Sequence, residues 1–534
     1  MAAQGGEAEF DVIVVGAGFA GLYQLYRLRN MGLRVRVLEA GGGVGGTWYW
    51  NRYPGARCDI ESMQYSYQFS PELQQEWNWT ERYAAQPEIL TYANHVADRF
   101  DLRKDISFNT RVARAVWNEK NRSWRIETED GDTLSARYCI MATGCLSSPN
   151  TPRFEGLETF KGPVYHTGQW PHEPVDFTGK TVAVIGTGSS AVQSIPVIAA
   201  QAKKVYVFQR TPHWVIPARN RPLDPDEQRR WKERYPELRA EAKKTFTGVL
   251  AKYRSEKAAE ASPDEIRSEY QRRWDEGGLG FMGAFGDLLI DDEANRTARE
   301  FVAAKLREMV KDPKLADALT PDYLIGCKRL VIDTGYYETF NKPHVQLVDI
   351  SNSPIERITP QGVRANGREI DVDVLVLATG FDAMTGALTR IDIRGRDGQS
   401  LKEKWAEGPQ TYLGLMSAGF PNLFMITGPG SPSVLTNMLP TIEQHVEWVS
   451  DCIGHMRDHQ KSAIEPRREA EVAWGIHNAE VAGNTLKPSC SSWYVGANIP
   501  GKPRVFLPYM GGFPTYIEKC NEVVRNGYDG FVLN

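Results

Sequence analysis

Two stretches of the chain pass from a short apolar run to a helical pattern across a glycine turn. In the first, residues 10–21 read FDVIVVGAGFAG, and apolar side chains then recur at helical spacing as far as Leu28. In the second, residues 180–191 read KTVAVIGTGSSA, and the same helical spacing follows. Strand, glycine turn and helix in this order are typical of a dinucleotide-binding unit. The pattern therefore predicts an α/β fold with two Rossmann-like domains.

The first glycine turn has the residues that a dinucleotide requires at each position. Gly16 permits the tight turn, Gly18 lets the backbone approach a pyrophosphate, and Gly21 lets the helix pack closely on the strand. The next apolar run ends at Glu39, at the offset of about 20 residues where an acid accepts the ribose hydroxyls. A glycine triplet alone occurs in many turns, but the strand, triplet, helix, second strand and terminal acid together are specific.

An aromatic segment follows this unit directly. Residues 40–62 read AGGGVGGTWYWNRYPGARCDIES, so a flexible glycine loop is followed by large flat side chains. They form either a surface turn with aromatic packing or the lining of a flavin site, and we favour the flavin site, which predicts FAD as the first cofactor. A buried acid in this segment needs a cationic partner. The candidate residues here are Gly46, Thr47, Trp48, Asp59 and Tyr65.

The second unit differs from the first in the residues that would read the ribose. Its triplet consists of Gly186, Gly188 and Ala191, and alanine at the third position is common where the dinucleotide is phosphorylated. Its next strand, residues 204–208, ends without an acid. Because a carboxylate would repel a 2′-phosphate whereas Arg210 can pair with it, the second cofactor is predicted to be NADP(H). Further candidates at this site are Ser189, Ser190 and Thr211.

The remaining patterns divide the chain into interleaved domains. Residues 138–144 and 370–380 each run from an apolar strand into ATG, where a nucleotide-binding unit closes. Between them, residues 219–311 carry Glu, Lys and Arg at helical spacing, with a capping box at 262–265, and predict a helical insertion without chemistry of its own. The expected boundaries are 1–147 and 382–534 for the FAD domain, 148–220 and 325–381 for the NADP domain, and 221–324 for the insertion.

Composition narrows the range of partners. The 534 residues carry a net charge of −4 with a pI near 6.2, and no basic cluster alternates with aromatics, so we expect no nucleic-acid partner. No apolar run approaches the ~20 residues of a membrane span, and residues 1–9 do not resemble a signal peptide. We therefore expect a cytoplasmic protein with small-molecule partners and no membrane contact, present as a monomer or weak oligomer.

Cysteine and histidine spacing adds no further site. Seven cysteines are spread from Cys58 to Cys520 without a CxxC pair, which argues against a disulfide framework, a zinc cluster and a dithiol centre. We interpret them as buried thiols. Nine histidines show no HExxH or similar ligand spacing, so no metal site is predicted.

Two motifs resemble one enzyme family. GGTWYWNRYPGARCD matches the pattern GGxWxxxxYPGxxxD, and residues 160–171, FKGPVYHTGQWP, match FxGxxxHxxxWP between the two glycine triplets. With both Rossmann units, the chain resembles type I Baeyer-Villiger monooxygenases, in particular the phenylacetone and steroid monooxygenase-like members, over almost its whole length. The resemblance implies that NADPH reduces FAD, that O2 adds at flavin C4a, and that the peroxyflavin attacks a ketone to give an ester or lactone. It also allows sulfoxidation as a side activity and implies that NADP+ stays bound.

The resemblance also implies residue roles. Arg329 matches the catalytic arginine, which suits a reaction that needs a fixed cation, and Asp59 matches the acid that holds it. Lys328 would assist Arg210 at the 2′-phosphate. Leu435 and Met438 resemble ketone-pocket positions, whereas Cys145 stands where glutamine is expected. In the linker, His166 and Trp170 are assigned to structure and domain coupling, and Trp493 resembles the aromatic of a mobile loop over NADP.

Two other functions are compatible with the dinucleotide motifs. One is an N- or S-oxygenating flavin monooxygenase, and the other is a flavoprotein that binds both nucleotides as a redox sensor without turnover. The linker ending in Trp-Pro and the pair of Asp59 with Arg329 weigh against the first. The complete set of both motifs weighs against the second.

Overall fold

The first nucleotide unit forms a large mixed sheet at one end of the molecule. The structure is a computed structural model that describes residues 8–534. The central strand β1 (Phe10–Val15) pairs in parallel with β2 (Val35–Leu38) and with β6 (Thr133–Met141). The sheet order is β17-β4-β5-β6-β1-β2-β3, and β18 also pairs with β6. Its other strands are β3 (Ile106–Ser107), β4 (Val112–Asn118), β5 (Ser123–Thr128), β17 (Asp392–Arg394) and β18 (Leu423–Met425).

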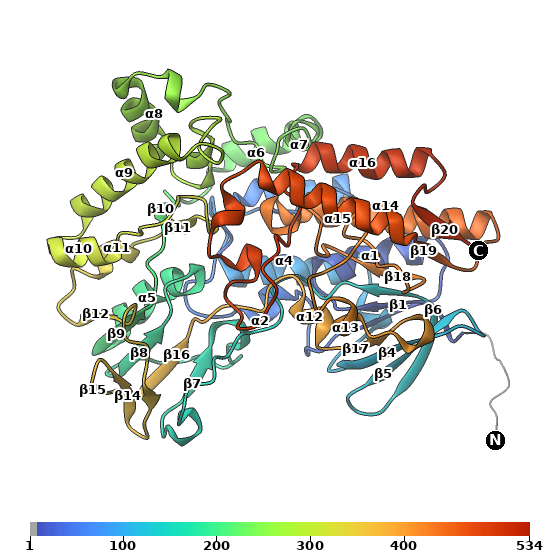
Figure 1. The fold of residues 1–534 in the computed structure, drawn as a ribbon, viewed down its shortest axis with the longest axis horizontal. Coiled ribbons are helices and arrows are strands. Elements are labelled where there is room, and N and C mark those ends of the chain that lie inside the picture. The colour runs from blue at the N-terminus through green and yellow to red at the C-terminus, as the bar shows by residue number, and fades with distance from the viewer. Residues whose placement is uncertain (1–7) are drawn as a thin grey trace.

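The C-terminal third of the chain completes this unit. Strands β17 and β18 enter the same sheet as β1, and α14 (Met438–Asp458) packs against α1 (Phe19–Asn30). Figure 1 shows α14 next to α1, and α15 (Arg468–Gly483) and α16 (Phe513–Arg525) at the same end of the molecule as the N-terminal strands, from which they are far apart in sequence. The two segments share one hydrophobic core, in which Leu22 and Val449 are both fully buried.

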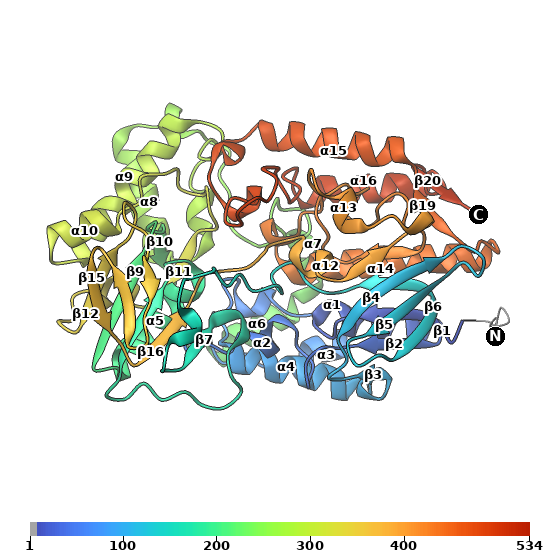
Figure 2. The ribbon, with the colours of Figure 1, turned by 60° about the horizontal axis from the view of Figure 1, so that its bottom comes forward.

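The second nucleotide unit is a parallel sheet with the order β12-β9-β8-β16-β7. It carries α5 (Ser189–Gln201) after its glycine turn, as predicted. The linker at residues 160–171 is not a separate spacer, because part of it forms the edge strand β7 and pairs with β16. Figure 2 shows the two sheets at opposite ends of the molecule. The strands are β7 (Val164–His166), β8 (Thr181–Ile185), β9 (Lys204–Gln209), β12 (Val345–Asp349) and β16 (Val374–Leu377). Together the two units confirm the predicted fold class.

The predicted helical insertion packs in two directions. Tyr235, at the start of α7, is buried in the core of the first unit. Tyr270 in α8 belongs to a separate core that includes Trp214 and Ile332, next to the second unit. Ser262 begins α8 with the predicted capping box. The helices concerned are α6 (Pro225–Glu233), α7 (Tyr235–Ala242), α8 (Pro263–Glu276), α9 (Asp292–Met309) and α10 (Pro313–Leu319), with β10 (Val215–Pro217) and β11 (Val331–Asp333) joining them to the sheet.

Short elements connect these bodies. The remaining helices and strands are α2 (Thr47–Trp50), α3 (Pro71–Glu76), α4 (Gln86–Arg99), α11 (Tyr336–Thr339), α12 (Gly386–Thr389), α13 (Leu401–Lys404), β13 (Arg357–Ile358), β14 (Gly362–Ala365), β15 (Arg368–Asp371), β19 (Ile464–Pro466) and β20 (Phe531–Leu533). No helix within residues 8–534 is long and apolar enough to cross a membrane. In the same residues, no three His, Cys, Asp or Glu side chains are grouped to hold a metal ion. The reading of residues 1–9 as unlike a signal peptide lies largely outside the described part.

One prediction about the cysteines is wrong. Cys327 and Cys490 form a disulfide, with their Cα atoms 5.6 Å apart and a sequence separation of 163. The other five cysteines are free and buried, as predicted. Sequence spacing could not reveal the pair, because only the packing of the C-terminal loop against the second unit brings the two residues together.

Thiol counting checks this disulfide. In denaturant without reductant, a thiol reagent is expected to titrate five cysteines, and after reduction seven. The variant Cys490→Ser frees Cys327, so it should show six thiols in both conditions. Seven thiols in the unreduced wild-type protein would contradict the pairing.

Candidate active site

The first glycine turn brings α1, β1 and the aromatic loop (residues 40–62) into backbone contact. A Cβ at Gly16, where φ is +105°, would lie 2.6 Å from the carbonyl oxygen of Ala142, and one at Gly21 would lie 1.8 Å from that of Gly16. A Cβ at Gly18 would meet only Gly46, at 3.4 Å. Glycine at these positions therefore packs the turn, and the amino end of α1 faces the loop at Gly46. An open helix N-terminus of this kind stabilises a pyrophosphate.

Glu39 lies at the end of β2 and is 5% exposed. Its Oε2 accepts a hydrogen bond from the amide of Ala17 (2.6 Å), and its Oε1 accepts one from the amide of Gly41 (2.7 Å). Burial raises the pKa of this carboxyl, and the two amides oppose that effect. A carboxylate oxygen has more than one lone pair, so both oxygens still have acceptor capacity for ribose hydroxyls.

The aromatic loop forms the wall between the two units. Thr47 is exposed at the first position of α2, and the indole Nε1 of Trp48 donates to the hydroxyl of Tyr65 (3.1 Å). The rings of Trp48 and Tyr65 meet edge to face, with centroids 6.0 Å apart. These are the residues predicted for the flavin site, and the fold gathers them beside Gly46.

The same loop docks on the helix of the second unit. Tyr53 donates to Oε1 of Gln193 in α5 (2.7 Å), and Nε2 of Gln193 donates to the carbonyl of Arg57 (3.1 Å). A Cβ at Gly55 would lie 2.2 Å from the carbonyl oxygen of Gln193. The YPG sequence thus lets the two nucleotide units approach to backbone contact, and α2 lies between the two sheets (Figure 2).

The second glycine turn leaves room for a ligand. A Cβ at Gly186 would lie 2.4 Å from the carbonyl oxygen of Ala378, but one at Gly188 would meet nothing within 4 Å. Ser189 is exposed at the start of α5, and the hydroxyls of Ser190 and Thr167 are 3.0 Å apart. The latter contact joins this turn to the linker.

Two cations follow the second unit's strands. Arg210 is exposed and forms no ion pair or hydrogen bond with other groups in residues 8–534, and the carbonyl of the next residue, Thr211, accepts from the Thr187 hydroxyl (2.7 Å). The ammonium of Lys328 lies 4.3 Å from the ring centroid of Tyr323. Burial, then the charge of Arg210, lowers the pKa of Lys328 to about 8. Two neighbouring cations that repel each other are suited to an anion such as a 2′-phosphate.

Arg329 is fixed by a bidentate ion pair with Asp59. Its Nε donates to Oδ2 of Asp59 (2.5 Å) and its Nη2 donates to Oδ1 (2.9 Å), across 270 residues of sequence. Its Nη1 donates to the carbonyl of Val434 (2.6 Å). Burial alone would lower the pKa of Arg329, but the carboxylate of Asp59 outweighs burial and raises it. Arg329 is therefore a permanent cation where the aromatic loop, the second unit and the C-terminal third meet.

The linker histidine is held neutral. His166 is 8% exposed, its Nδ1 accepts from the amide of Gly168 (2.9 Å), and its Nε2 lies 3.2 Å from both the carbonyl of Asn150 and the hydroxyl of Thr379. Burial lowers its pKa, partly offset by the bond to Asn150.

Trp170 connects the linker to the aromatic loop. Its amide donates to the carbonyl of Trp50 (3.3 Å), and its buried ring packs with Tyr165 and Phe177. The linker therefore contacts the first unit directly through its backbone, while His166 ties it to the second unit.

The predicted pocket residues gather around a small apolar core beside Arg329. Buried Cys145, Val434 and Tyr494 belong to this core, and half-buried Leu435, Met438 and Trp493 pack against it. The Ser433 hydroxyl lies 3.5 Å from Sγ of Cys145, and burial raises the pKa of that thiol. Cys145 is thus a buried free thiol of this core.

Sequence reasoning missed three residues of this region. Val434 supplies the carbonyl that accepts from Arg329, and Tyr494 interacts electrostatically with the same guanidinium. Lys487 is buried close to Tyr494 and to the charge of Arg329. None carried a signal of its own. The two neighbours of predicted positions, Val434 beside Leu435 and Tyr494 beside Trp493, could have been found only by extending those predictions by one residue.

Comparison with known proteins agrees with this geometry. The pyridine nucleotide-disulphide oxidoreductase family model matches residues 13–270. The chain is 42% identical to acetone monooxygenase (methyl acetate-forming) of Gordonia sp. (strain TY-5), covering 98% of this chain and 99% of that protein. It is also 42% identical to a Baeyer-Villiger monooxygenase of Pseudooceanicola batsensis, covering 98% and 96%. Phenazine N-monooxygenase PhzNO1 of Lysobacter antibioticus is 40% identical, covering 99% and 98%.

Solved structures extend the likeness to the whole fold. Oxidized steroid monooxygenase bound to NADP is 52% identical, with a TM-score of 0.94 over 98% of this chain and 99% of that one. The OTEMO complex with FAD and NADP is 40% identical, with a TM-score of 0.96 over 99% and 100%. Since relatives above 40% identity span nearly the entire sequence on both sides, the chain belongs to the Baeyer-Villiger monooxygenases.

Proposed function

We propose that this protein is an NADPH- and O2-dependent flavoprotein monooxygenase that inserts one oxygen atom next to a ketone carbonyl to give an ester or lactone. The observation that carries the proposal is Arg329, held by Asp59 at the junction of the two nucleotide units. FAD is assigned to the first glycine turn and NADP to the second. Sulfoxidation is proposed as a side activity.

The residues present fit both cofactors. The first turn offers the open N-terminus of α1 and the acceptor Glu39, which suit the pyrophosphate and ribose of FAD. The second offers open space at Gly188 with the cations Arg210 and Lys328, which suit NADP. When bound, the flavin activates O2 with electrons from NADPH. The chain's own part is to bind, orient and stabilise charge.

Arg329 has the properties that oxygen transfer to a carbonyl requires. Negative charge develops on oxygen as the carbonyl is attacked, and a preorganised guanidinium stabilises it without moving. Asp59 and the carbonyl of Val434 accept from three of its five N–H donors, and the Tyr494 hydroxyl also bonds to the guanidinium, which leaves at least one donor for the reacting groups. Cys145, Leu435 and Met438 are proposed to bound the ketone beside it.

The linker is proposed to couple the two units. His166 accepts from a backbone amide and is too desolvated to protonate readily, so we assign it to structure and not to acid–base chemistry. Trp170 joins the linker to Trp50 in the aromatic loop. A movement of the NADP unit would therefore shift the wall of the flavin site, and Trp493 is proposed to cover NADP in the closed state.

The test is a turnover assay with defined substrates. Purified protein with its flavin is mixed with NADPH, air, and a panel of linear, cyclic and aryl ketones, and products are identified by mass spectrometry. Ester or lactone formation that depends on NADPH is the expected result. A protein that oxidises NADPH but yields no oxygenated product with any ketone in the panel would contradict the proposal, and one that binds both nucleotides without turnover would support the sensor alternative.

A second candidate is N-oxygenation. It is favoured by one observation, the 40% identity to a protein named phenazine N-monooxygenase over nearly the full length of both. The same assay with an aromatic N-heterocycle separates the two, because N-oxide formation with no ester from any ketone would select this candidate.

Cellular location, oligomeric state and partners are part of the proposed function. We propose a cytoplasmic monomer or weak oligomer whose partners are the ketone, O2 and NADPH, without nucleic acid or membrane. Sedimentation at several concentrations tests the oligomeric part. A cytoplasmic address would place the Cys327–Cys490 disulfide among cellular thiols, where disulfides are uncommon.

The lowered pKa of Lys328 predicts a pH dependence of NADP+ binding. Its folded pKa is about 8, so the ammonium is charged below that pH and loses its charge above it. The 2′-phosphate is fully ionised above pH 7. NADP+ affinity should therefore fall about tenfold from pH 7 to pH 9.5 as one charged contact is lost, while NAD+ affinity stays flat.

Calorimetric titration of both nucleotides at several pH values measures this effect. The variant Lys328→Met should bind NADP+ weakly at pH 7 and show a flat profile. An unchanged slope in that variant would remove Lys328 from the phosphate site.

A further inference from the structure

Lys487 is a buried cation without an acidic partner. It is 7% exposed, its Nζ donates to the carbonyl of Gly326, and it forms no ion pair with a carboxylate in residues 8–534. Its ammonium lies 4.8 Å from the ring centroid of Tyr494. Burial, then the charge of Arg329, lowers its pKa to about 8. Burying a cation is costly unless it is hydrogen-bonded, so the ammonium depends on the carbonyl of Gly326 and on the Tyr494 ring to stay buried.

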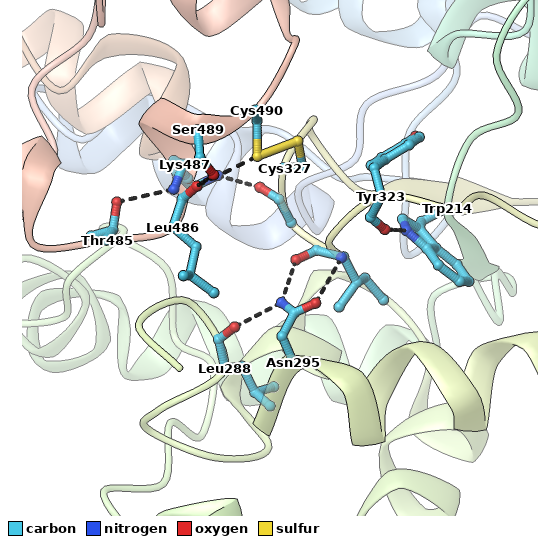
Figure 3. Close-up of a disulfide and its surroundings, with 12 residues drawn as sticks. Trp214, Leu288, Asn295, Tyr323, Cys327, Thr485, Leu486, Lys487, Ser489 and Cys490 are labelled. Atoms are coloured by element: carbon cyan, nitrogen blue, oxygen red, sulfur yellow. Dashed lines mark hydrogen bonds between the residues drawn. A yellow bond between two sulfur atoms is a disulfide. The ribbon is translucent and has the colours of Figure 1, made fainter. Parts of the chain in front are cut away.

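The disulfide joins the segment of Lys487 to the segment of Gly326 a second time. Cys327 follows Gly326, and the amide of Cys490 donates to the carbonyl of Lys487 (3.1 Å). Figure 3 shows Lys487 beside the bridge from Cys490 to Cys327. The loop that leads to Trp493 is thus attached to the segment that leads to Arg329 by one covalent bond and one buried ammonium.

The arginine segment is also held from its other side. Asn295 in α9 is fully buried, its Nδ2 donates to the carbonyls of Leu288 (2.8 Å) and Ile325 (2.9 Å), and its Oδ1 accepts from the amide of Ile325 (3.1 Å). The backbone from Ile325 to Cys327 is therefore fixed three times within the two to four residues before Arg329. Backbone position there sets where the guanidinium lies.

Tyr494 lies between Lys487 and the guanidinium of Arg329. It is 2% exposed, its ring faces Lys487, and it interacts electrostatically with Arg329, whose charge partly offsets the burial that raises the pKa of the phenol to about 12. A shift of Lys487 would move Tyr494 and the backbone before Arg329 together.

We propose that Lys487 is a positioning residue for Arg329, acting with the Cys327–Cys490 disulfide to tie the loop of Trp493 and Tyr494 to the arginine segment. The role given to Arg329 rests on the proposed function, but the anchor itself does not. Loss of Lys487 keeps both Arg329 and Asp59 in the chain, but it makes the position of the guanidinium and of the loop with Trp493 and Tyr494 less fixed. Coupling of NADPH oxidation to oxygenation should then suffer more than flavin reduction.

The test compares Lys487→Met, Cys490→Ser and the matched control Lys402→Met, which makes the same change at an exposed lysine of α13. Amide hydrogen exchange of the holoenzyme is followed in residues 324–331 and 484–496. We expect exchange in both segments to accelerate at least tenfold in Lys487→Met, about threefold in Cys490→Ser, and not at all in the control. A dithiol reductant reduces the Cys327–Cys490 bridge to two thiols and is itself oxidised to a disulfide. Its effect on exchange in the wild type should match that of Cys490→Ser.

Kinetics supply the second readout. In Lys487→Met the fraction of NADPH oxidation whose electrons reduce O2 to hydrogen peroxide should rise about fivefold, while the rate of flavin reduction stays within twofold. Lys487→Arg, which restores the charge, should recover at least half of the coupling. Unchanged exchange in both segments of Lys487→Met, or uncoupling equal in Lys402→Met, would overturn the proposal. If Lys487→Met does not fold, the reduced wild type and Cys490→Ser decide by the same exchange criterion.

The two proposals can fail separately. If wild-type protein oxygenates no ketone but exchange accelerates in Lys487→Met as expected, the anchor stands and the proposed reaction falls. If ketones are oxygenated but exchange does not change in any variant, the reaction stands and the anchor falls.

Discussion

Replacing Arg329 by alanine is expected to abolish ester formation while NADPH still bleaches the flavin. The variant removes the guanidinium that is paired with Asp59 at the junction of the two units. Loss of one preorganised donor to a developing negative oxygen costs on the order of 10²–10³ in rate, and loss of the full positive charge places the expectation at the upper end. Hydride transfer needs no such cation, so anaerobic flavin reduction should change by less than about tenfold.

Two comparisons make this result specific. Arg329→Lys keeps a charge but cannot form the bidentate pair, so its rate of flavin reduction should also change by less than about tenfold, and it should retain little of the oxygenation. Arg457→Ala, at an exposed arginine of α14, should leave both half-reactions unchanged. Stopped-flow absorbance measures reduction, and product analysis measures oxygenation. Normal ester formation by Arg329→Ala would remove this residue from the mechanism.

The parts of the site that depend on local sequence could be predicted. The turn at Gly16 and Gly21 must pack strand on helix within a few residues, and so its composition reports its structure directly. Glu39 and Arg210 each follow a strand at a fixed offset, and the fold places both where parallel strands end. The pair of Asp59 and Arg329 is 270 residues apart and came only from the family resemblance.

The parts that depend on long-range packing could not be predicted. Cys327 and Cys490 have no spacing that distinguishes them from the five free thiols, and their pairing needs the C-terminal loop to lie on the second unit. Lys487 looks like any surface lysine in the sequence, and its burial depends on the same packing. The insertion was predicted as one helical body, but Tyr235 and Tyr270 are buried in different cores.

Contact between the units explains why the linker motif and the aromatic motif occur together. Gly55 meets the backbone of Gln193 in α5, and Trp170 bonds to the backbone of Trp50, so both motifs form the same interface from opposite sides. Ser190 adds a contact between α5 and Thr167 in the linker. The two sequence patterns are therefore one structural feature, the interface between the two nucleotide units.

The second large effect is expected at the 2′-phosphate. Arg210→Ala should weaken NADPH binding by about 2 kcal/mol, or roughly 30-fold in Kd, because a charged hydrogen-bonding pair beside Lys328 is lost. NADH, which lacks the phosphate, should bind the variant as it binds wild type. The preference for NADPH over NADH should thus fall by the same factor.

Anaerobic flavin reduction at varied nucleotide concentration measures both affinities in one experiment. The matched control is Arg219→Ala, at an arginine whose side chain donates to the carbonyl of Trp274 in α8 and which should leave the preference unchanged. The double variant Arg210→Ala/Lys328→Met should lose nearly all discrimination, because both cations that face the anion are then gone. Equal losses for NADPH and NADH in Arg210→Ala would show that this arginine supports the fold of the nucleotide turn and does not read the phosphate.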